Sequence, residues 1–299
     1  CVCGSRQQCK SNIYAIGGMY VQLLRGKEVA DFHREQVERR LAAWQEKNVQ
    51  PELAIILVGE DKPSAMYAKS MRKVAQTAGL TAEIYHRDTT VSEEELIALI
   101  TALNQQPSVF GILPMMPLPS HVDTQRILNY IDADKDVDGL TDSSAARLFT
   151  GRPGFIPCTP RAVIAILDYY HISLTGKEVA IIGRSNVVGK PLAQLCLGRN
   201  ATVTHCHTRT RDLKSLTKRA DVVIAAAGKA NLVTADMIKP GAIVIDVGIN
   251  RLNGKTVGDV AFDEVAKVAG AITPVPGGVG AVTTMMVLEN TVCGAVQRD

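Results

Sequence analysis

A strand, a glycine turn and a helix start follow one another in the second half of the chain. This feature constrains the fold more than any other. The apolar run Val179–Ile182 predicts a buried strand, and it leads directly into Gly183-Arg-Ser-Asn-Val-Val-Gly-Lys-Pro191. Such a turn lets backbone N–H groups approach a phosphate at a helix N-terminus. It therefore predicts a dinucleotide site and a redox protein; a plain chain reversal is the alternative, because the spacing is not Gly-x-Gly-x-x-Gly. The candidate cofactor-binding residues in this turn are Gly183, Arg184, Ser185 and Gly189.

The next predicted strand, Thr202–His207, indicates which dinucleotide is bound. A fold that prefers NAD places an acidic residue roughly 20 residues after the glycines, where it holds the ribose 2′-hydroxyl. Here no Asp or Glu occurs between Glu178 and Asp212, and the strand ends in His207-Thr-Arg-Thr-Arg211. Hydroxyl and guanidinium groups can bind a 2′-phosphate, whereas an acid would repel it. The sequence therefore favours NADP, with a solvated basic loop as the alternative; the candidates here are His207, Thr208 and Arg209.

Apolar periodicity predicts an α/β fold, with strands and helices in alternation. In the first half, helices are expected at 27–47, 63–78, 93–104 and 121–131, and strands at 53–58, 82–85 and 109–116. Ser92 and Glu95 form a capping-box pattern at the start of the third helix. Alternating elements of this kind imply a parallel sheet with right-handed crossovers.

The run Phe155–Pro160 interrupts this alternation and predicts a hinge between two domains. A helix at 161–170 is followed by a Rossmann-type series with strands near 178–183, 202–207, 221–226 and 243–247, and by a last helix at 282–297. We expect an N-terminal extension at 1–18, a catalytic α/β domain at 19–158 that the returning segment 281–299 completes, and a nucleotide-binding domain at 159–280. Ligands bind at the carboxyl ends of such strands, which predicts a cleft between the two domains.

Composition limits the classes of function. A length of 299 residues is typical of two domains, and a hydrophobic content of 46% is sufficient for an apolar core. A formal charge of +3 does not indicate a nucleic-acid-binding surface. No apolar run approaches the ~18 residues of a membrane span. Four scattered cysteines suit reduced thiols in a cytoplasmic protein, and the cluster Cys1, Cys3 and Cys9 lacks a second ligand group, so no metal is expected. We do not expect residues 1–18 to be a secretory signal, because they contain no acidic residue and no apolar core. They could be the remnant of a transit sequence, which would imply a mitochondrial location, or an added extension.

Three further segments are unusual for scaffolding. Pro63-Ser-Ala-Met-Tyr67 opens a helix, Asp134-Lys-Asp-Val-Asp-Gly139 is an acidic turn, and Thr273-Pro-Val-Pro-Gly-Gly-Val-Gly280 is a rigid turn. Taken alone, each segment can be explained without a function: the acidic segment as an ordinary turn, the Pro-Gly-Gly segment as an ordinary loop, and Tyr67 as a packing residue. Together with the dinucleotide turn, Gly111–Pro119, Phe155–Pro160 and Lys239–Asn250, they resemble the methylenetetrahydrofolate dehydrogenase/cyclohydrolase family over about residues 19–297.

The resemblance implies a two-domain homodimer, associated through its NADP domain, that acts on a tetrahydrofolate derivative. Such enzymes oxidise 5,10-methylenetetrahydrofolate to the methenyl form and then hydrolyse it to 10-formyltetrahydrofolate. The family's substrate-stacking tyrosine falls on Tyr67, and its folate-anchoring aspartate falls on Asp138. A carboxylate can accept two parallel N–H bonds from a pterin edge. By the same resemblance Pro276, Gly277 and Gly280 border the folate, and Thr159, Ala226, Ile249 and Thr283 border NADP.

The chain departs from the family pattern at two positions of one site and also after the glycine turn, where the family's Pro-Met-Thr reads Ala281-Val-Thr283. The family has Tyr-x-x-x-Lys, with a lysine that drives cyclohydrolase chemistry, whereas the residue four after Tyr67 is Met71. The glutamine that supports this lysine is replaced by Met115. Lys69 and Lys73 do not share a helix face with Tyr67. A buried glutamine that lost its lysine partner would destabilise the protein by about 1–3 kcal/mol, because its amide group would lack a hydrogen bond. Loss of the lysine and the glutamine together is therefore physically consistent.

These departures separate two reactions. Hydrolysis of the methenyl bridge needs activated water and proton transfers, which methionine cannot supply. Hydride transfer depends mainly on positioning. We therefore expect an NADP-dependent dehydrogenase with weak or absent cyclohydrolase activity. The alternatives are a non-catalytic folate- or NADP-binding paralogue, a dehydrogenase for another small substrate, and a full bifunctional enzyme.

Overall fold

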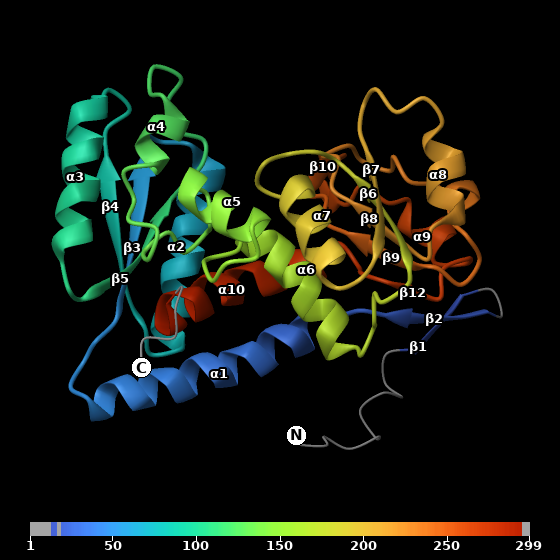
Figure 1. The fold of residues 1–299 in the computed structure, drawn as a ribbon, viewed down its shortest axis with the longest axis horizontal. Coiled ribbons are helices and arrows are strands. Elements are labelled where there is room, and N and C mark those ends of the chain that lie inside the picture. Colours follow the sequence, from blue (N-terminus) through green and yellow to red (C-terminus); the bar gives the residue numbers. More distant parts are fainter. Residues whose placement is uncertain (1–12, 17–18, 295–299) are drawn as a thin grey trace. The chain divides into compact units, whose positions relative to one another are not determined.

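The structure is a computed structural model that describes residues 13–16 and 19–294, and it separates into two compact units (Figure 1). One unit comprises the residues up to Val29 together with Thr159–Val282, and we call it the seven-stranded unit. The other comprises Ala30–Cys158 and the residues from Thr283 onward, and we call it the three-stranded unit. The chain crosses between the units at three places, which fall within helices α1, α6 and α10.

The three-stranded unit is built on a parallel sheet of order β4-β3-β5. Its strands are β3 (Glu52–Val58), β4 (Thr81–Arg87) and β5 (Val109–Pro114). Its helices are α1 (Gly26–Glu46), α2 (Lys62–Thr77), α3 (Glu93–Gln105), α4 (Thr124–Leu128), α5 (Asp142–Phe149) and the end of α10 (Val279–Cys293). β3 is central and buried on both faces, as a parallel strand requires.

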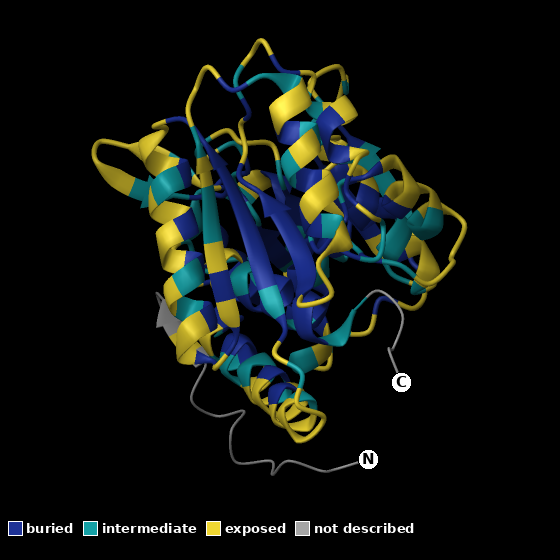
Figure 2. Ribbon diagram, turned by 90° about the vertical axis from the view of Figure 1, so that its left-hand side faces the viewer, coloured by how far each residue is buried: buried dark blue, intermediate teal, exposed yellow. Residues whose placement is uncertain are grey.

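The core of this unit follows the alternation of side chains along β3. Ala54, Ile56 and Val58 point to one face, where they join a cluster that includes Leu96 and Ile100 of α3. The remaining buried residues of β3 point to the opposite face. Figure 2 shows buried strands, β3 and β5, beside the partly exposed edge strand β4, and helices that expose their outer sides, which is the pattern of a layered α/β domain.

Local sequence signals explain the helix boundaries. The Ser92 hydroxyl accepts the backbone N–H of Glu95 and caps α3, and the Glu95 carboxylate accepts the backbone N–H of Ser92, so the predicted capping box is confirmed. The helix expected over 121–131 is wrong in extent, because only Thr124–Leu128 is helical. Asp123 accepts the N–H of Arg126 and starts the helix there, while His121 precedes it. The segment 155–160, predicted as a hinge, already contributes 158–160 to a helix.

The seven-stranded unit has the sheet order β1-β2-β12-β9-β8-β6-β7, in which only the β1–β2 pair is antiparallel. Its strands are β1 (Ile13–Ile16), β2 (Met19–Leu23), β6 (Glu178–Ile182), β7 (Thr202–Cys206), β8 (Val222–Ala225), β9 (Ile243–Asp246) and β12 (Ala271–Ile272). A separate hairpin joins β10 (Asn250–Leu252) to β11 (Lys255–Val257). The helices are α6 (Cys158–Tyr169), α7 (Gly189–Gly198), α8 (Leu213–Arg219), α9 (Phe262–Val265) and the 3-10 turn η2 (Ala235–Met237).

Strand β2 corrects the expected assignment of residues 19–29. These residues were assigned to the catalytic domain, but Gln22 and Leu23 pair with Ala271 and Ile272 of β12. Val21 and Leu23 also pack into the apolar cluster of the seven-stranded sheet. The pairing partner is about 250 residues away along the chain, so no local signal could reveal it.

The strand order places a topological switch point between β6 and β8. The chain leaves β6 toward β7 on one side, and it leaves β8 toward β9 on the other. In open α/β sheets, ligands bind outside the carboxyl ends of the strands at such a point. The turn at Gly183 follows β6 and therefore lies at this position.

Two expectations fall partly or wholly outside the described residues. The cysteine cluster at positions 1, 3 and 9 lies there, as does most of the segment 1–18. Within the described part of the chain, no group of three or more His, Cys, Asp or Glu side chains is arranged to hold a metal ion. Among the same residues, every helix is too short or too polar to cross a membrane.

Candidate active site

The turn after β6 is tightly built around two glycines. Gly183 has φ of 126°, and a Cβ on it would lie 2.0 Å from the carbonyl oxygen of Ala226. A Cβ on Gly189 would lie 2.0 Å from the carbonyl oxygen of Gly183. Ala226 follows β8, so the loops after β6 and β8 touch at the switch point. Any side chain at either glycine would force these loops apart.

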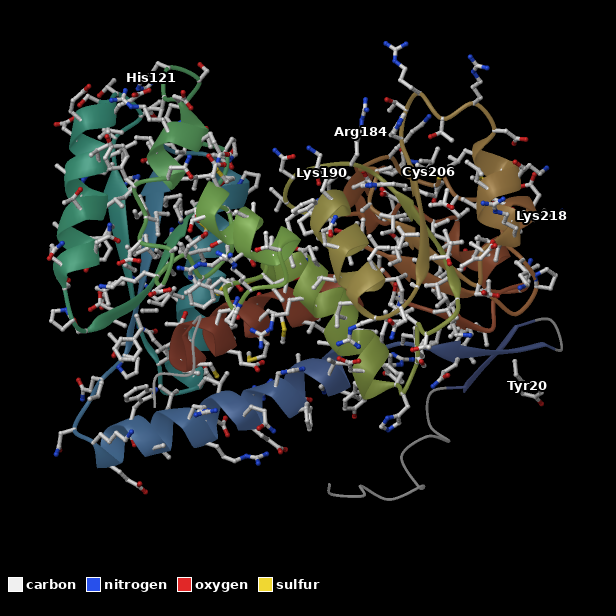
Figure 3. All side chains as sticks on the ribbon, in the orientation of Figure 1. Tyr20, His121, Arg184, Lys190, Cys206 and Lys218 are labelled. Carbon is white, nitrogen blue, oxygen red and sulfur yellow. The ribbon has the colours of Figure 1, made fainter. Side chains whose placement is uncertain are left out.

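The helix that follows begins without a side-chain cap and is flanked by cations. The residue before α7, Val188, gives no side-chain cap. The hydroxyl of Ser185 accepts the N–H of Val188 at 3.1 Å, which shapes the turn. Arg184 and Lys190 are exposed and project from the turn and from the first turn of α7 (Figure 3). An uncapped helix N-terminus flanked by cations is a favourable position for phosphate groups.

Two histidines, one in β7 and one directly after it, complete this edge. The Nε2 atom of His205 lies 2.6 Å from the carbonyl oxygen of Gly183, so it supports the glycine turn. Beyond the strand, the Nδ1 atom of His207 accepts the N–H of Arg209 at 3.1 Å, and Thr210 accepts the N–H of His207 at 2.8 Å. His207 thus organises the basic turn. Thr208 and Arg209 remain exposed at its tip, where they can meet a phosphate.

The other residues predicted to border a cofactor are divided between the units. Thr159 lies half-buried in the first turn of α6, and Ile249 is exposed just after β9; both belong to the seven-stranded unit. Thr283 belongs to the three-stranded unit. The dinucleotide turn, the uncapped helix and the exposed basic loop form one edge that fits a dinucleotide phosphate.

The Pro-Gly-Gly turn lies in the seven-stranded unit. Pro276, Gly277 and Gly280 are exposed. The carbonyl oxygen of Gly277 accepts the N–H of Gly26 at 2.8 Å, and a Cβ on Gly26 would lie 2.0 Å from the oxygen of Gly278. The start of α1 therefore fixes this turn in place.

In the three-stranded unit, the cluster around Asp138 has perturbed electrostatics. The backbone N–H of Cys158 donates to Asp138 Oδ1 at 3.0 Å. Burial raises the pKa of Asp138 to about 6; the hydrogen bonds from Cys158 act against this rise, and the nearby Asp136 carboxylate adds to it. A carboxylate offers about four acceptor positions, so Asp138 can accept further N–H groups from a ligand.

Tyr67 lies in the same cluster. Although 42% of the residue is exposed, burial of its hydroxyl raises the pKa of Tyr67 to about 12. A hydrogen bond with the Thr284 side chain opposes this rise, while Asp138 and Cys158 contribute to it. The hydroxyl therefore stays protonated at neutral pH, and the exposed part of the ring can stack against a flat ligand.

Met71 and Met115 are buried, with exposures of 0% and 5%. Met71 lies on the buried face of α2 together with Ser64, Ala68 and Ala75. The hydroxyl of Ser64 donates to the carbonyl oxygen of Met116 at 2.9 Å, so the start of α2 is held against the segment that carries Met115. Lys69 and Lys73 are exposed, so neither lies on this buried face of the helix.

The acidic turn 134–139 divides into structural and site residues. Lys135 is buried, and its Nζ donates to the carbonyl oxygens of Leu103, Asn104 and Gln106 at 2.7–3.1 Å. Asp136 is also buried and accepts the N–H groups of Leu140 and Thr141 and the hydroxyl of Ser144. Asp134 pairs with Arg147 at 2.9 Å. Asp138 is thus the acid of this turn that contacts the Tyr67 cluster.

Sequence reasoning missed three members of this cluster. Cys158 donates to the carbonyl oxygen of Val137 and carries the N–H that binds Asp138. Asn290 of α10 is buried and donates to the same carbonyl at 2.8 Å. Thr284 binds Tyr67. Cys158 lies in the run Phe155–Pro160, which the sequence analysis had singled out, so that run could have indicated it. The roles of Thr284 and Asn290 depend on contacts between distant segments and have no signal in the sequence.

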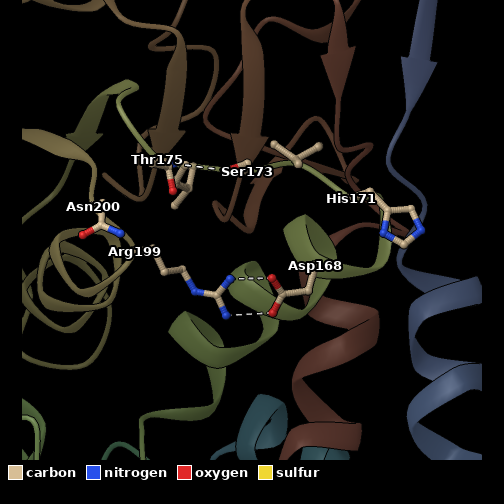
Figure 4. Close-up of a pocket in the computed structure, with 8 residues that line it drawn as sticks. Asp168, His171, Ser173, Thr175, Arg199 and Asn200 are labelled. Atoms are coloured by element: carbon tan, nitrogen blue, oxygen red, sulfur yellow. Dashed lines mark hydrogen bonds and ion pairs between the residues drawn. The ribbon is translucent and has the colours of Figure 1, made fainter. Parts of the chain in front are cut away.

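A surface pocket lies elsewhere in the seven-stranded unit (Figure 4). It is lined by the end of α6, the segment 171–175 and the end of α7. Its charged side chains, Asp168 and Arg199, already form a two-bond ion pair. This pocket precedes β6, whereas the glycine turn follows that strand, so it lies at the wrong end of the sheet for a dinucleotide.

Comparisons with known proteins agree with this geometry. Residues 24–138 match the catalytic domain of tetrahydrofolate dehydrogenase/cyclohydrolase, and residues 157–299 match the NAD(P)-binding domain of the same family. The bifunctional protein FolD of Polaromonas sp. is 48% identical over 274 residues, which cover 91% of this chain and 98% of that protein. The FolD protein of Bacillus velezensis is 45% identical, with coverages of 93% and 98%.

Solved structures give the same result. The bifunctional FolD enzyme of Campylobacter jejuni superposes with a TM-score of 0.91 at 45% identity, covering 92% of this chain and 98% of that one. The FolD enzyme of Trypanosoma brucei, solved with NADP cofactor and inhibitor, has a TM-score of 0.86 at 34% identity, with coverages of 91% and 96%. These matches confirm the predicted two-domain α/β fold with parallel sheets. The chain belongs to the tetrahydrofolate dehydrogenase/cyclohydrolase family, with a catalytic domain and an NAD(P)-binding domain.

Proposed function

We propose that this protein catalyses the NADP-dependent oxidation of 5,10-methylenetetrahydrofolate to 5,10-methenyltetrahydrofolate, with weak or absent cyclohydrolase activity. The observation that supports the loss of cyclohydrolase activity is the buried pair Met71 and Met115. By family resemblance these positions hold the lysine and glutamine of cyclohydrolase chemistry. The relatives named above are bifunctional, so this chain would differ from them in the reaction that follows oxidation.

The choice of NADP is supported by the basic, acid-free turn after β7. Thr208 is exposed in this turn, and Arg184 and Ser185 are exposed in the turn after the neighbouring strand β6; these three residues would hold the 2′-phosphate. Gly183 and Gly189 would let the backbone approach the pyrophosphate, because neither position has room for a side chain. The T. brucei relative solved with NADP is consistent with this choice.

On the substrate side, Asp138 and Tyr67 would bind the pterin. The Asp138 carboxylate would accept N–H bonds from the aminopyrimidinone edge, and the Tyr67 ring would stack on the ligand. The Pro276–Gly280 turn would border the folate. When bound, NADP accepts the hydride that leaves the methylene carbon. The residues of this chain need only hold the substrate in a reactive orientation, which is the main requirement of hydride transfer.

Hydrolysis makes a demand that this site does not meet. Water must be activated, and protons must reach the leaving nitrogen. The thioethers of Met71 and Met115 have no titratable proton, and they form an apolar, adaptable wall. Tyr67 stays protonated at neutral pH and is a poor base. The methenyl product would therefore leave the enzyme largely intact.

The same resemblance supports two broader proposals. We propose that the protein is a homodimer associated through its NADP-binding domain and that it acts in the cytoplasm. Sedimentation of the purified protein at several concentrations tests the first proposal, and a single monomeric species throughout would contradict it.

One assay tests the enzymatic proposal. The purified protein is mixed with 5,10-methylenetetrahydrofolate and NADP, and both NADPH and the methenyl product are followed. We expect the two to accumulate together. NADP binding without NADPH formation would favour a non-catalytic binding paralogue. Rapid loss of added methenyl substrate would instead favour a full bifunctional enzyme and would contradict the loss of cyclohydrolase activity.

A further inference from the structure

A buried carboxylate lies behind the loop that follows β8. Asp259 is 0% exposed, and its Oδ2 atom accepts the backbone N–H groups of Ala227 at 2.6 Å and Gly228 at 2.9 Å. Its Oδ1 atom accepts the N–H of Lys229 at 2.8 Å and the side-chain amide of Asn250 at 2.9 Å. Three consecutive backbone donors therefore point inward at one carboxylate. The opposite side of this loop, with its carbonyl groups and side chains, is left for other partners.

A second buried carboxylate holds the first. Asp246, the last residue of β9, accepts the N–H groups of Gly248 at 2.9 Å and Asp259 at 3.0 Å on one oxygen. Its other oxygen accepts the N–H of Val260 at 2.9 Å. The backbone N–H of Asp246 donates to the hydroxyl of Thr273 at 2.7 Å. Asp246 thus connects the end of β9, the segment at Asp259 and the start of the turn that follows β12.

The backbone around the pair is shaped to admit both carboxylates. A Cβ on Gly248 would lie 2.2 Å from Asp259 Oδ1, and a Cβ on Gly258 would lie 1.9 Å from Asp246 Oδ2. Each carboxylate therefore rests directly on a glycine of the neighbouring segment. Charge-assisted bonds to backbone donors are short and directional, so the pair restricts the loops more than neutral side chains would.

All the connected segments lie at the carboxyl edge of the sheet. Strands β8 and β9 are neighbours in the sheet, and β12 pairs with β9 (Figure 1). The residue before the bound loop is Ala226, whose carbonyl oxygen packs against Gly183 of the dinucleotide turn. Ile249, adjacent to Gly248, is exposed at the same edge. The carboxylate pair therefore lies beneath the surface that the proposed function assigns to NADP.

We infer that Asp246 and Asp259 are positioning residues for the cofactor. They hold the backbone after β8 and β9 in the shape that receives the dinucleotide, without touching it. The inference rests on the proposed NADP site and adds to it residues that hold its surface from behind. Because the loops are set before binding, loss of either carboxylate would weaken cofactor affinity more than it changes the rate at saturation.

The test measures binding rather than turnover. NADPH is titrated by its fluorescence into the unaltered protein and into Asp259→Asn, which places an amide NH₂ against one of the backbone donors. We expect Kd to rise at least tenfold, with faster hydrogen exchange at the amides of 227–229. Gly248→Ala should act in the same direction, because its Cβ would displace the Asp259 carboxylate.

Asp221→Asn is the matched control. Asp221 also accepts a backbone N–H in this sheet, that of Glu178 at 3.0 Å, but it does so at the amino ends of the strands. We expect it to lower thermal stability while leaving the NADPH Kd within twofold. An unchanged Kd in both Asp259→Asn and Gly248→Ala would overturn the inference, as would equal losses in Asp221→Asn.

Two further outcomes keep the inference separate from folding and from the proposed function. If the variants do not fold, hydrogen exchange on the unaltered protein decides. The amides of 227–229 should be protected before NADP is added, and rapid exchange there would overturn the inference. Failure of the unaltered protein to bind NADPH would overturn the proposed function and the inference together; unchanged binding by folded variants would overturn the inference alone.

Discussion

At the scale of single residues, burial and partners give similar side chains opposite roles. Asp136 and Asp138 are two residues apart, yet Asp136 is enclosed by two backbone N–H groups and a hydroxyl. Asp138 instead faces Tyr67 and Cys158, and its pKa is raised to about 6. The sequence of the acidic turn does not show which of its aspartates is buried as a structural residue and which can bind a ligand. Family resemblance supplied the choice of Asp138.

The raised pKa of Asp138 predicts a pH dependence. Because burial favours the neutral form, the carboxyl group is protonated below about pH 6 and then accepts fewer N–H bonds from a pterin. We expect kcat/KM for 5,10-methylenetetrahydrofolate to fall as pH decreases through about 6, measured at saturating NADP. Asp138→Asn should lower kcat/KM and remove the inflection, whereas Asp134→Asn should retain it. An unchanged inflection in Asp138→Asn would assign it to another group.

The methionine pair predicts a gain of function. Met71→Lys combined with Met115→Gln restores an ammonium group and its amide partner, and general acid–base catalysis is commonly worth about 10²–10⁴ in rate. We expect hydrolysis of added methenyltetrahydrofolate to rise at least about tenfold in the double variant. Met71→Lys alone should be less stable, because it buries an unpaired charge.

Met66→Lys is the control for this gain. Met66 lies on the same helix but is 71% exposed, so this substitution adds a cation to the helix without changing the buried residues Met71 and Met115. We expect its hydrolysis rate to match that of the unaltered protein. No gain in the double variant would mean that other residues of the site also limit hydrolysis.

At the scale of elements, the long helices were predictable, and so were the strongly apolar strands near 178–183, 202–207, 221–226 and 243–247, which match β6–β9. The expected helices at 27–47, 63–78 and 93–104 match α1, α2 and α3 to within a residue or two, because apolar spacing and caps act locally. Helix α4 is shorter than expected. Helix α5 and the strands β10–β12 were not predicted; they are short and show no clear apolar period, and packing decides them.

Helix α3 illustrates how an element depends on a distant residue. Its C-terminal carbonyl groups accept three bonds from the buried ammonium of Lys135. We expect Lys135→Met to lower the free energy of unfolding by about 2–4 kcal/mol, because these carbonyls lose a charged donor. Chemical denaturation measures the change. Lys73→Met, at an exposed position of α2, should cost less than about 0.5 kcal/mol; equal costs would show that the cap contributes little.

At the scale of the whole molecule, each unit has its own sheet and its own apolar cluster. A ligand that binds one folded unit stabilises that unit by mass action. With NADP at about 100 times its Kd, we expect about 2.7 kcal/mol of added stability, seen as slower hydrogen exchange in the seven-stranded unit. A tetrahydrofolate derivative alone should protect the segments around Tyr67 and Asp138. Protection by NADP confined to the three-stranded unit would contradict the assignment of the cofactor turn.

The sequence by itself determined the α/β class, the dinucleotide turn and the absence of an acid after β7, because these depend on residues close together in the chain. The proposal that Met71 and Met115 replace a lysine and a glutamine also rests on the sequence, through the family resemblance. Only the tertiary structure decided that β2 joins the sheet of β12, that Cys158 holds Asp138, and that Asp246 and Asp259 tie three loops together. These are hydrogen bonds between segments far apart in sequence, and a linear pattern carries no record of which donors meet which acceptors.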